Sequence, residues 1–550
     1  MVTRVDPRDA CIARGQWHNI THVHFYEFPT EDPDHLEVWC YTDRLSYAPG
    51  ETVRFHTSST AKEYSIEVVR DGASPEVVYQ VDGLPGEMHR TPKDAFANGC
   101  GWPVAHEWTL PGDLRSGGYI VYSRARNDSE EEREQQHFFA VRPADPGRDA
   151  KILLVCATST WIAYNEWGGS NSYWGVPDAL PDQEPGAAVA APKLSIKRPW
   201  SRGFIWVPEG APRCPVSRPP VPGAVPRYEM IEYAYAYGLS KYYTAAGWAL
   251  YERLFVEWAE KNGYAVDVIT QHDLHFEPEI LQHYPCVALV GHDEYWSWEM
   301  RDSLESYIDA GGHVARFGSN FVWQIRFQDD GDTQVCYKLP DADPLFETDQ
   351  QHLLTTAWEC PLVNRPGAET LGLNGLSSAV YSHWSAFNPR SSGGYTVYRP
   401  EHWVFQGTDL YFGDVMGSEA TIVGYELDGV AFTFRNGLPY PTYEDGAPES
   451  LEILAMAPAK FEEEDHGNKG TLLFDGPGSW HEVSRLLFGQ DATQEQMDSI
   501  KHGAGMMGVF TRGRGEVFNA GTAEWVNGLK QRDFSTEQIT RNVLDRYTKE

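Results

Sequence analysis

The chain has 550 residues, more than one hydrophobic core usually serves, so we expect two or three domains. Its 45 basic and 79 acidic residues give a formal charge of −34. Such a charge repels the phosphate backbone of nucleic acids and anionic membrane surfaces. No apolar run is long enough to span a membrane, and the N-terminus lacks the apolar stretch of a signal peptide. The eight Cys form no C-x-x-C pair. These features predict a cytoplasmic protein with a small neutral substrate.

The first part of the chain has the pattern of short β-strands. Residues 1–35 are expected to form an N-terminal arm. Within residues 36–145, apolar side chains recur at every second position, as at Tyr119 and Val121, and Pro/Gly turns separate the runs. This alternation is typical of strands with one buried face. It predicts an antiparallel immunoglobulin-like β-sandwich.

A different pattern begins after the Pro- and Gly-containing linker at 143–149. Residues 151–156, 285–291 and 313–318 are continuous apolar runs, typical of strands covered on both faces of a parallel sheet. Helical patterns lie between the runs, including one at about 241–262 and one that Ser297 caps. The alternation predicts a doubly wound, parallel α/β domain over residues 149–550, flavodoxin-like and similar to the glutamine amidotransferases. A mixed insertion is expected at about 340–500.

Polar side chains follow three of these strands, where ligands bind in open α/β sheets. Tyr164 and Tyr173 follow the first strand, His292 and Glu294 follow the strand at 285–291, and Asn320 follows the strand at 313–318. Each has an ordinary structural explanation on its own, such as packing for a tyrosine or a helix N-terminal acid for Glu294. Their coincidence at neighbouring strand ends predicts an active site.

The motifs of several common hydrolases are missing. The turn after residues 285–290 reads Gly291-His-Asp-Glu-Tyr, with no Cys or Ser to act as a covalent nucleophile. The G-x-S-x-G motif is absent, and no glycine-rich phosphate loop follows the first strand. A nucleotide cofactor and an acyl-enzyme mechanism are therefore not expected.

Three segments together resemble a known family. They are Ala163-Tyr-Asn-Glu-Trp-Gly-Gly-Ser-Asn-Ser-Tyr, Gly291-His-Asp-Glu-Tyr-Trp-Ser and Gly318-Ser-Asn-Phe-Val-Trp. In this order they resemble the C-terminal domain of the N,N-dimethylformamidase large (beta) subunit family. The resemblance implies an iron-dependent amidohydrolase that cleaves a C–N bond of a small, formamide-like N-alkyl amide to a carboxylate and an amine. It also implies a homo-oligomer, with or without a small accessory subunit.

The same resemblance implies roles for six residues. Tyr164 and Tyr173 would be tyrosinate ligands of a mononuclear Fe(III), and Glu294 would be its carboxylate ligand. His292 and Asn320 would contact water or substrate. By similarity to a later family segment, Glu426 in Gly424-Tyr-Glu-Leu-Asp-Gly would face the metal. The tyrosine-rich run at 228–243 is an alternative source of one phenolate.

The chemistry of these groups is consistent with the implied metal. Phenolate and carboxylate oxygens are hard anionic donors that favour a hard trivalent cation over zinc. Aromatic walls for small N-alkyl groups are expected from Trp161, Trp167, Trp296 and Trp323.

Two alternative functions remain open from the sequence. His22 and His24 form an H-x-H pair, which would suit a zinc-dependent amidohydrolase, although no eightfold βα pattern follows it. The other alternative is a non-catalytic protein that binds carbohydrate or a protein partner through its aromatic-rich β-domain.

Overall fold

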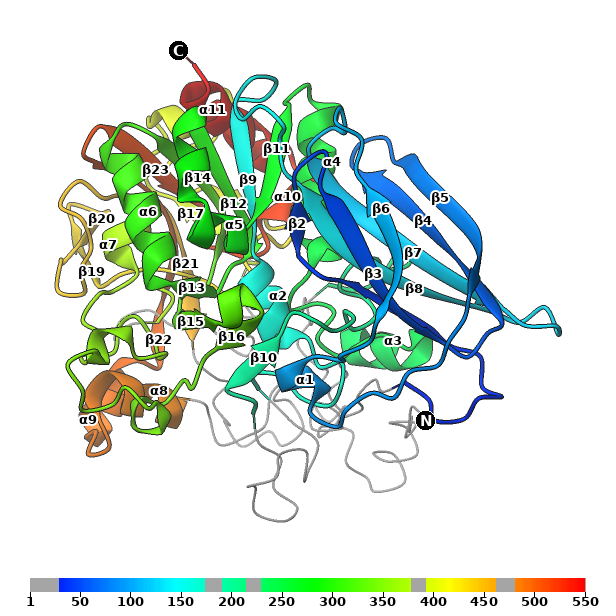
Figure 1. The fold of residues 1–550 in the computed structure, drawn as a ribbon. Helices are drawn as coiled ribbons and strands as arrows, with labels where there is room; N and C mark the ends of the chain where they lie inside the picture. Colours follow the sequence, from blue (N-terminus) through cyan, green and yellow to red (C-terminus); the bar gives the residue numbers. More distant parts are fainter. Residues whose placement is uncertain (1–28, 174–189, 214–228, 377–391, 461–479, 550) are drawn as a thin grey trace, which may run out of the picture.

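The computed structural model describes residues 29–173, 190–213, 229–376, 392–460 and 480–549 (Figure 1). Two sheets come from the first part of the chain, with the strand orders β1–β3–β6 and β2–β8–β7–β4–β5. Their pairings are antiparallel except for β2–β8. The strands are β1 (Val38–Thr42), β2 (Ser46–Tyr47), β3 (Thr52–Ser59), β4 (Glu63–Asp71), β5 (Glu76–Pro85), β6 (Val104–Thr109), β7 (Gly117–Arg126) and β8 (Glu132–Val141).

These two sheets share a hydrophobic core. Val53 and Phe55 of β3 and Ile66 and Val68 of β4 are fully buried, while the residues between them are partly or fully exposed. Successive side chains of a strand point to opposite faces, so this alternation buries one face of each sheet.

A nine-stranded sheet dominates the rest of the molecule, in the order β11–β9–β12–β14–β23–β22–β21–β17–β18. The strands from β11 to β23 in this order pair in parallel, and those from β23 to β18 pair antiparallel. The strands are β9 (Ile152–Cys156), β11 (Val266–Thr270), β12 (Cys286–His292), β14 (His313–Ser319), β17 (Tyr395–Val397), β18 (Val415–Met416), β21 (Glu452–Lys460), β22 (His502–Arg512) and β23 (Gly515–Asn519).

A smaller sheet begins where two of these strands end. Its order is β10–β16–β15–β13, and β13 follows β12 by two residues. The strands are β10 (Lys193–Ser195), β13 (Tyr295–Ser297), β15 (Trp323–Gln328) and β16 (Thr333–Val335), and β19 (Phe432–Arg435) and β20 (Leu438–Pro441) form a separate hairpin. Because β13 continues from β12 and β15 from β14, the small sheet lies at the carboxyl ends of both parallel strands.

The α-helices of the described chain are short. They are α1 (Ala95–Asn98), α2 (Thr158–Tyr164), α3 (Glu229–Tyr237), α4 (Glu252–Lys261), α5 (Gln271–Phe276), α6 (Trp298–Asp309), α7 (Ala368–Leu371), α8 (Trp480–Phe488), α9 (Gln494–Ser499), α10 (Trp525–Gln531) and α11 (Phe534–Tyr547). The Ser297 hydroxyl accepts the Met300 N–H, so the predicted cap of α6 is confirmed. None of the helices in this part of the chain combines the length and apolar character needed to cross a membrane.

The predicted fold class, a doubly wound parallel α/β domain behind an immunoglobulin-like sandwich, is wrong. The sheets are mostly mixed and antiparallel, with 32% of the described residues in strands and 23% in helices. The chain reverses at a hairpin that pairs Arg512 with Gly515, and the sheet continues with antiparallel strands. An antiparallel neighbour needs only a tight turn, whereas a parallel neighbour needs a crossover. The run 502–512 is buried over most of its length and does not alternate, so its direction was not readable from the sequence. The domain boundaries stay a prediction.

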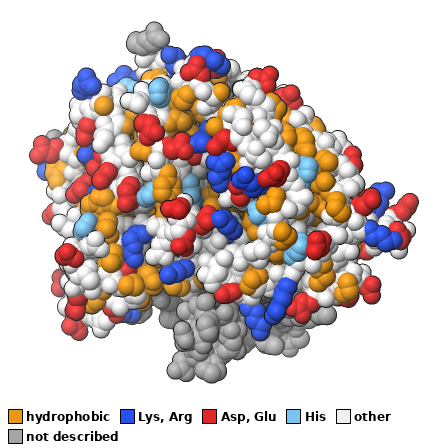
Figure 2. Space-filling model, viewed as in Figure 1, with side chains coloured by type: hydrophobic (Ala, Val, Ile, Leu, Met, Phe, Trp, Pro, Cys, Tyr) orange, Lys and Arg blue, Asp and Glu red, His pale blue; other side chains and the backbone are white. Residues whose placement is uncertain are grey.

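The first two sheets pack against the edge of the nine-stranded sheet, beside β11 and α4 (Figure 1). The Val268 N–H of β11 donates to the Ser116 hydroxyl at 2.9 Å, and Arg70 pairs with Glu260 at 2.6 Å. Acidic and basic side chains are interspersed over the face drawn in Figure 2. The charge of −34 is therefore not gathered there into one acidic surface.

Candidate active site

The candidate site lies at the carboxyl ends of β12 and β14. Gly291 and Gly318 are paired neighbours there, and a Cβ on Gly318 would lie 2.4 Å from the Gly291 carbonyl oxygen. Gly291 also has φ of +77°, which strongly favours glycine. The close approach of the two backbones places the next residues, His292 and Ser319, side by side. The backbone N–H of Trp323 donates to the backbone carbonyl of Glu294 at 2.8 Å. This bond joins the loops that leave the two strands.

Glu294 is the centre of the hydrogen-bonded cluster. Its carboxylate is buried, and the Tyr173 hydroxyl lies 2.8 Å from both of its oxygens. The indole N–H of Trp323 donates to Oε1 at 2.6 Å. The Tyr295 hydroxyl donates to the Tyr173 oxygen at 2.9 Å. A buried carboxylate needs such donors because leaving it without partners would be costly.

Tyr164 completes a pair of facing phenols. It is the last residue of α2 and is 6% exposed, and its ring centroid lies 4.5 Å from that of Tyr173. Burial, and then the charge of Glu294, raise the pKa of both phenols well above 10. In this arrangement both hydroxyls are therefore protonated. A cation held between them and Glu294 would reverse the second of these effects.

His292 and Asn320 form the next layer of contacts. The His292 Nδ1 lies 2.6 Å from the Ala245 carbonyl oxygen, which can only accept, so Nδ1 carries a proton. Burial lowers the pKa of His292, and the charge of Glu294 opposes this effect. The ring is then neutral, and its Nε2 accepts from the Asn320 side-chain amide at 2.9 Å. That same Nε2 lies 3.4 Å from a Glu294 oxygen.

Two residues of the site have backbone conformations that are rare outside glycine. Asn320 has φ of +67° and Glu426 has φ of +52°. The Asn320 N–H donates to Asp428 at 2.6 Å, and the Ser319 hydroxyl donates to the Glu426 carbonyl at 2.7 Å. Strained conformations persist only where surrounding contacts fix them, and they cluster at functional sites.

The structure thus brings together Tyr164, Tyr173, Glu294, His292 and Asn320. The buried carboxylate of Glu426 lies near enough to raise the pKa of Tyr164. In the described part of the chain, no three His, Cys, Asp or Glu side chains form a metal-binding group. The phenol–carboxylate cluster is a different donor set, and its three oxygen-bearing side chains suit a hard cation. The assigned roles stay predictions.

The structure also locates some of the alternative ligands and the aromatic walls that the sequence suggested. Tyr242, from the tyrosine-rich run, lies against both phenols, with ring centroids 5.8 Å from Tyr164 and 6.5 Å from Tyr173. His22 and His24, the proposed zinc ligands, fall outside the described residues. Of the four expected aromatic walls, Trp323 contacts Glu294, whereas the other three pack in the protein core, namely Trp161, Trp167 and Trp296.

Sequence reasoning missed three members of the site. Tyr295 directly follows Glu294, so its position beside the carboxylate was a usable signal. Tyr425 packs its ring 5.1 Å from that of His292, and Lys338 holds its ammonium 3.3 Å from the Tyr173 ring centroid. Nothing near Lys338 in the sequence indicated that position.

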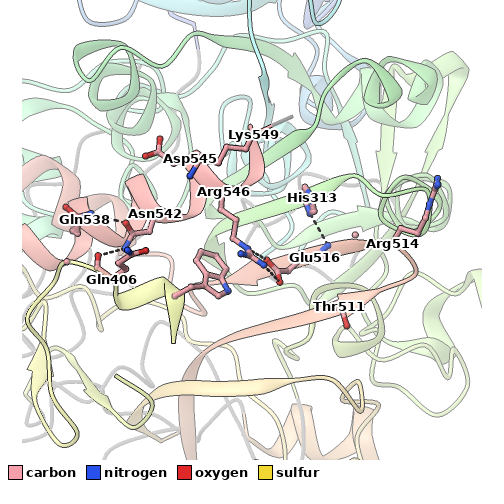
Figure 3. Close-up of a pocket in the computed structure, with 13 residues that line it drawn as sticks. His313, Gln406, Thr511, Arg514, Glu516, Gln538, Asn542, Asp545, Arg546 and Lys549 are labelled. Atoms are coloured by element: carbon pink, nitrogen blue, oxygen red, sulfur yellow. Dashed lines mark hydrogen bonds and ion pairs between the residues drawn. The ribbon is translucent and has the colours of Figure 1, made fainter. Parts of the chain in front are cut away.

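A cavity of about 780 Å³ lies at the other end of the parallel strands (Figure 3). His313, which begins β14, and Gly515, which begins β23, both line it. Arg546 pairs there with Glu516 at 2.7 Å and lies over the ring of Trp403. None of the residues of the candidate site lines this cavity, so it is a separate feature.

Fold and site define a protein with a buried phenol–carboxylate cluster at the ends of parallel strands. A family model described as N,N-dimethylformamidase beta subunit-like, C-terminal, matches residues 65–539. The chain belongs to this family, and the resemblance predicted from the three segments is confirmed.

Individual relatives are distant. The N,N-dimethylformamidase beta subunits of Alcaligenes sp and Paracoccus aminophilus are 23% and 24% identical, over 82% and 54% of this chain. These matches cover 55% and 36% of those proteins, so the chain spans about half the length of its curated relatives, or less. Among solved structures, the match to murine CRIg covers 19% of this chain and 97% of the CRIg chain, at 10% sequence identity. The TM-score of 0.14 is too low to carry an argument.

Proposed function

We propose that this chain hydrolyses the C–N bond of a small N-alkyl amide, formamide-like in size, to a carboxylate and an amine. The observation that carries the proposal is the Tyr173–Glu294 contact at 2.8 Å, with His292 and Asn320 beside it. Membership of a family whose named relatives are N,N-dimethylformamidases supports the reaction class.

A mononuclear Fe(III) is the metal that this donor set would suit. Tyr164, Tyr173 and Glu294 would hold it, because two ionised phenols and a carboxylate match the charge of a trivalent ion. Tyr242 is the alternative second phenolate. When bound, a ferric ion supplies Lewis acidity, which polarises an amide carbonyl and acidifies water.

His292 is the proposed general base. Its Nδ1–H is committed to the Ala245 carbonyl, so any proton it takes from water must arrive at Nε2. Burial lowers its pKa and keeps the ring neutral and able to accept a proton. The imidazolium so formed would be stabilised by Glu294, whose oxygen lies 3.4 Å away.

Asn320 and Glu426 are proposed to act on the amide. The Asn320 side chain donates to His292 Nε2, and turning toward a developing oxyanion would release that nitrogen for the base role. The departing amine needs a proton, and His292, which carries the one taken from water, is one candidate donor. Glu426 is the other candidate, if its buried carboxyl group, which lies near Tyr164, is protonated at that stage.

The surroundings favour a small neutral substrate. Trp323 and Tyr295 place rings beside the cluster, and these would pack against N-alkyl groups while limiting water. The relatives are named as beta subunits, which supports association with another subunit or with further copies of this chain.

The test combines metal analysis with hydrolysis of N,N-dimethylformamide. We expect the wild type to bind one iron, to absorb visible light through tyrosinate charge transfer, and to release formate and dimethylamine in equal amounts. Glu294→Gln should lose most of the iron and the activity. Tyr164→Phe and Tyr242→Phe are then compared. The variant whose visible absorption band changes identifies the second phenolate.

Glu37→Gln is the matched control. Glu37 is also a buried glutamate that accepts a tryptophan indole N–H, from Trp39 at 3.2 Å, but it lies in the β1 region. This variant should keep its iron and its activity. Unchanged iron content and turnover in Glu294→Gln would refute the proposed site. Zinc in place of iron in the wild type would favour the alternative of a zinc-dependent amidohydrolase.

A further inference from the structure

A buried arginine lies behind the candidate site. Arg316 is in β14, four residues before Asn320, and its side chain is fully buried. Its guanidinium lies 3.8 Å from a carboxylate oxygen of Asp293 and 3.5 Å from one of Asp428. These aspartates come from two other segments, the loop after β12 and the loop before β19. One cation therefore faces two carboxylates inside the protein.

Each aspartate holds part of a loop that bears a site residue. Asp428 accepts the backbone N–H of Asn320 at 2.6 Å, and Asn320 in turn donates to His292. Asp293, between His292 and Glu294, accepts the Trp296 indole N–H at 2.8 Å and the Gln271 amide at 3.0 Å. The two carboxylates thus connect backbone and side-chain contacts of three loops.

Arg316 acts here through its charge more than through directed hydrogen bonds. Within the described residues, none of its three guanidinium nitrogens has a hydrogen-bond partner. The guanidinium carbon instead lies 5.4 Å from the ring centroid of Phe321. Two buried carboxylates without a cation would repel each other and remain uncompensated in a low dielectric. The positive φ of Asn320 adds a conformation that would relax if its anchor at Asp428 moved.

We propose that Arg316 is a positioning residue, whose charge holds Asp293 and Asp428 and thereby fixes the loops that carry His292, Asn320 and Glu426. The kinetic part of this inference rests on the proposed amide hydrolysis. The structural part, that Arg316 and Asp428 together hold the Asn320 backbone, does not.

Two substitutions of Arg316 separate charge from packing. Arg316→Met keeps much of the side-chain length and removes the charge, whereas Arg316→Lys keeps the charge and loses the guanidinium shape. We expect Arg316→Met to lower kcat for N,N-dimethylformamide about 100-fold, as a misplaced catalytic group does, with KM nearly unchanged. Arg316→Lys should recover most of that loss.

Hydrogen exchange provides a readout that does not depend on activity. The peptide covering residues 313–322 should exchange about tenfold faster in Arg316→Met. The reason is that Asp428, which accepts the Asn320 N–H, is then no longer held in place by a cation. Asp428→Asn keeps the shape of the acceptor but not its charge, and it should also speed exchange in this peptide. It serves as the second variant if Arg316→Met does not fold.

Arg70→Met is the control, since Arg70 is a buried arginine of β4 that pairs with Glu260 of α4, outside these loops. It should lower stability without changing kcat or the exchange of residues 313–322. Wild-type exchange of this peptide in both Arg316→Met and Asp428→Asn overturns the inference, and so does a fall in kcat that Arg316→Lys does not recover. If the wild type hydrolyses no amide, the proposed function fails. The structural role of Arg316 is then tested by the hydrogen-exchange measurements alone.

Discussion

Replacing Glu252 by Gln should stabilise the protein at alkaline pH. Glu252 begins α4 and is 1% exposed. Its Oε1 accepts the Ala157 N–H at 2.9 Å, just ahead of the helix that carries Tyr164, while Oε2 has no hydrogen-bond partner among the described residues. Burial raises the pKa of Glu252 to about 8. The folded protein therefore keeps this carboxyl protonated where the unfolded chain does not.

The sign and size follow from linkage. With a pKa of 4.5 unfolded and about 8 folded, the folded state binds the extra proton across this interval. The stabilisation from Glu252 is fully present below pH 4.5 and is lost as pH rises to about 8. At about 1.4 kcal/mol for each pKa unit, the loss is about 5 kcal/mol. Gln cannot titrate, and its Oε1 can still accept the Ala157 N–H.

Urea unfolding at several pH values measures the effect. The free energy of unfolding of Glu252→Gln minus that of the wild type should rise by several kcal/mol between pH 5 and pH 8.5. Glu279→Gln, at an exposed position, should show no such rise. If the Glu252→Gln difference is the same at both pH values, the reasoning from burial is wrong.

Two further predictions concern the site and the acid side of the stability curve. Trp323→Phe removes the indole donor 2.6 Å from Glu294, so iron affinity in a chelator competition should fall about tenfold or more; wild-type affinity would show that this hydrogen bond does not orient the carboxylate. His137 is buried, and burial lowers its pKa from 6.5 to about 3. Its stabilising effect is present above pH 6.5 and is lost as pH falls toward 3, by about 5 kcal/mol. The free energy of unfolding of His137→Gln should therefore fall less steeply with decreasing pH than that of the wild type. The same acid transition in both proteins would contradict the lowered pKa of His137.

The local features of this protein could be read from its sequence. The continuous apolar run at 151–156 predicted a buried strand and the structure has β9 at Ile152–Cys156, while the cap at Ser297 marked the start of α6. The helical pattern at 241–262 was read too long, since α4 begins only at Glu252. Such features depend on neighbours within a few positions, so periodicity and capping chemistry specify them.

The position of the candidate site could be predicted from the sequence for a related reason. His292 ends β12, Glu294 lies two residues beyond it and Asn320 follows β14 directly. Parallel strands deliver their ends to the same edge of a sheet. Position along the chain therefore implied position in space for these three residues.

What only the tertiary structure decided were the contacts between distant segments. Tyr173 reaches Glu294 across 121 positions, Lys338 lies over the Tyr173 ring, and Arg316 faces Asp428. None of these contacts leaves a periodic trace in the sequence. The direction of β22 was equally hidden. A buried strand is apolar whether its neighbour runs parallel or antiparallel, and the short turn before β23 selected the antiparallel arrangement. Residue patterns record which surfaces become buried, but the partner that buries each surface is chosen only when the chain packs.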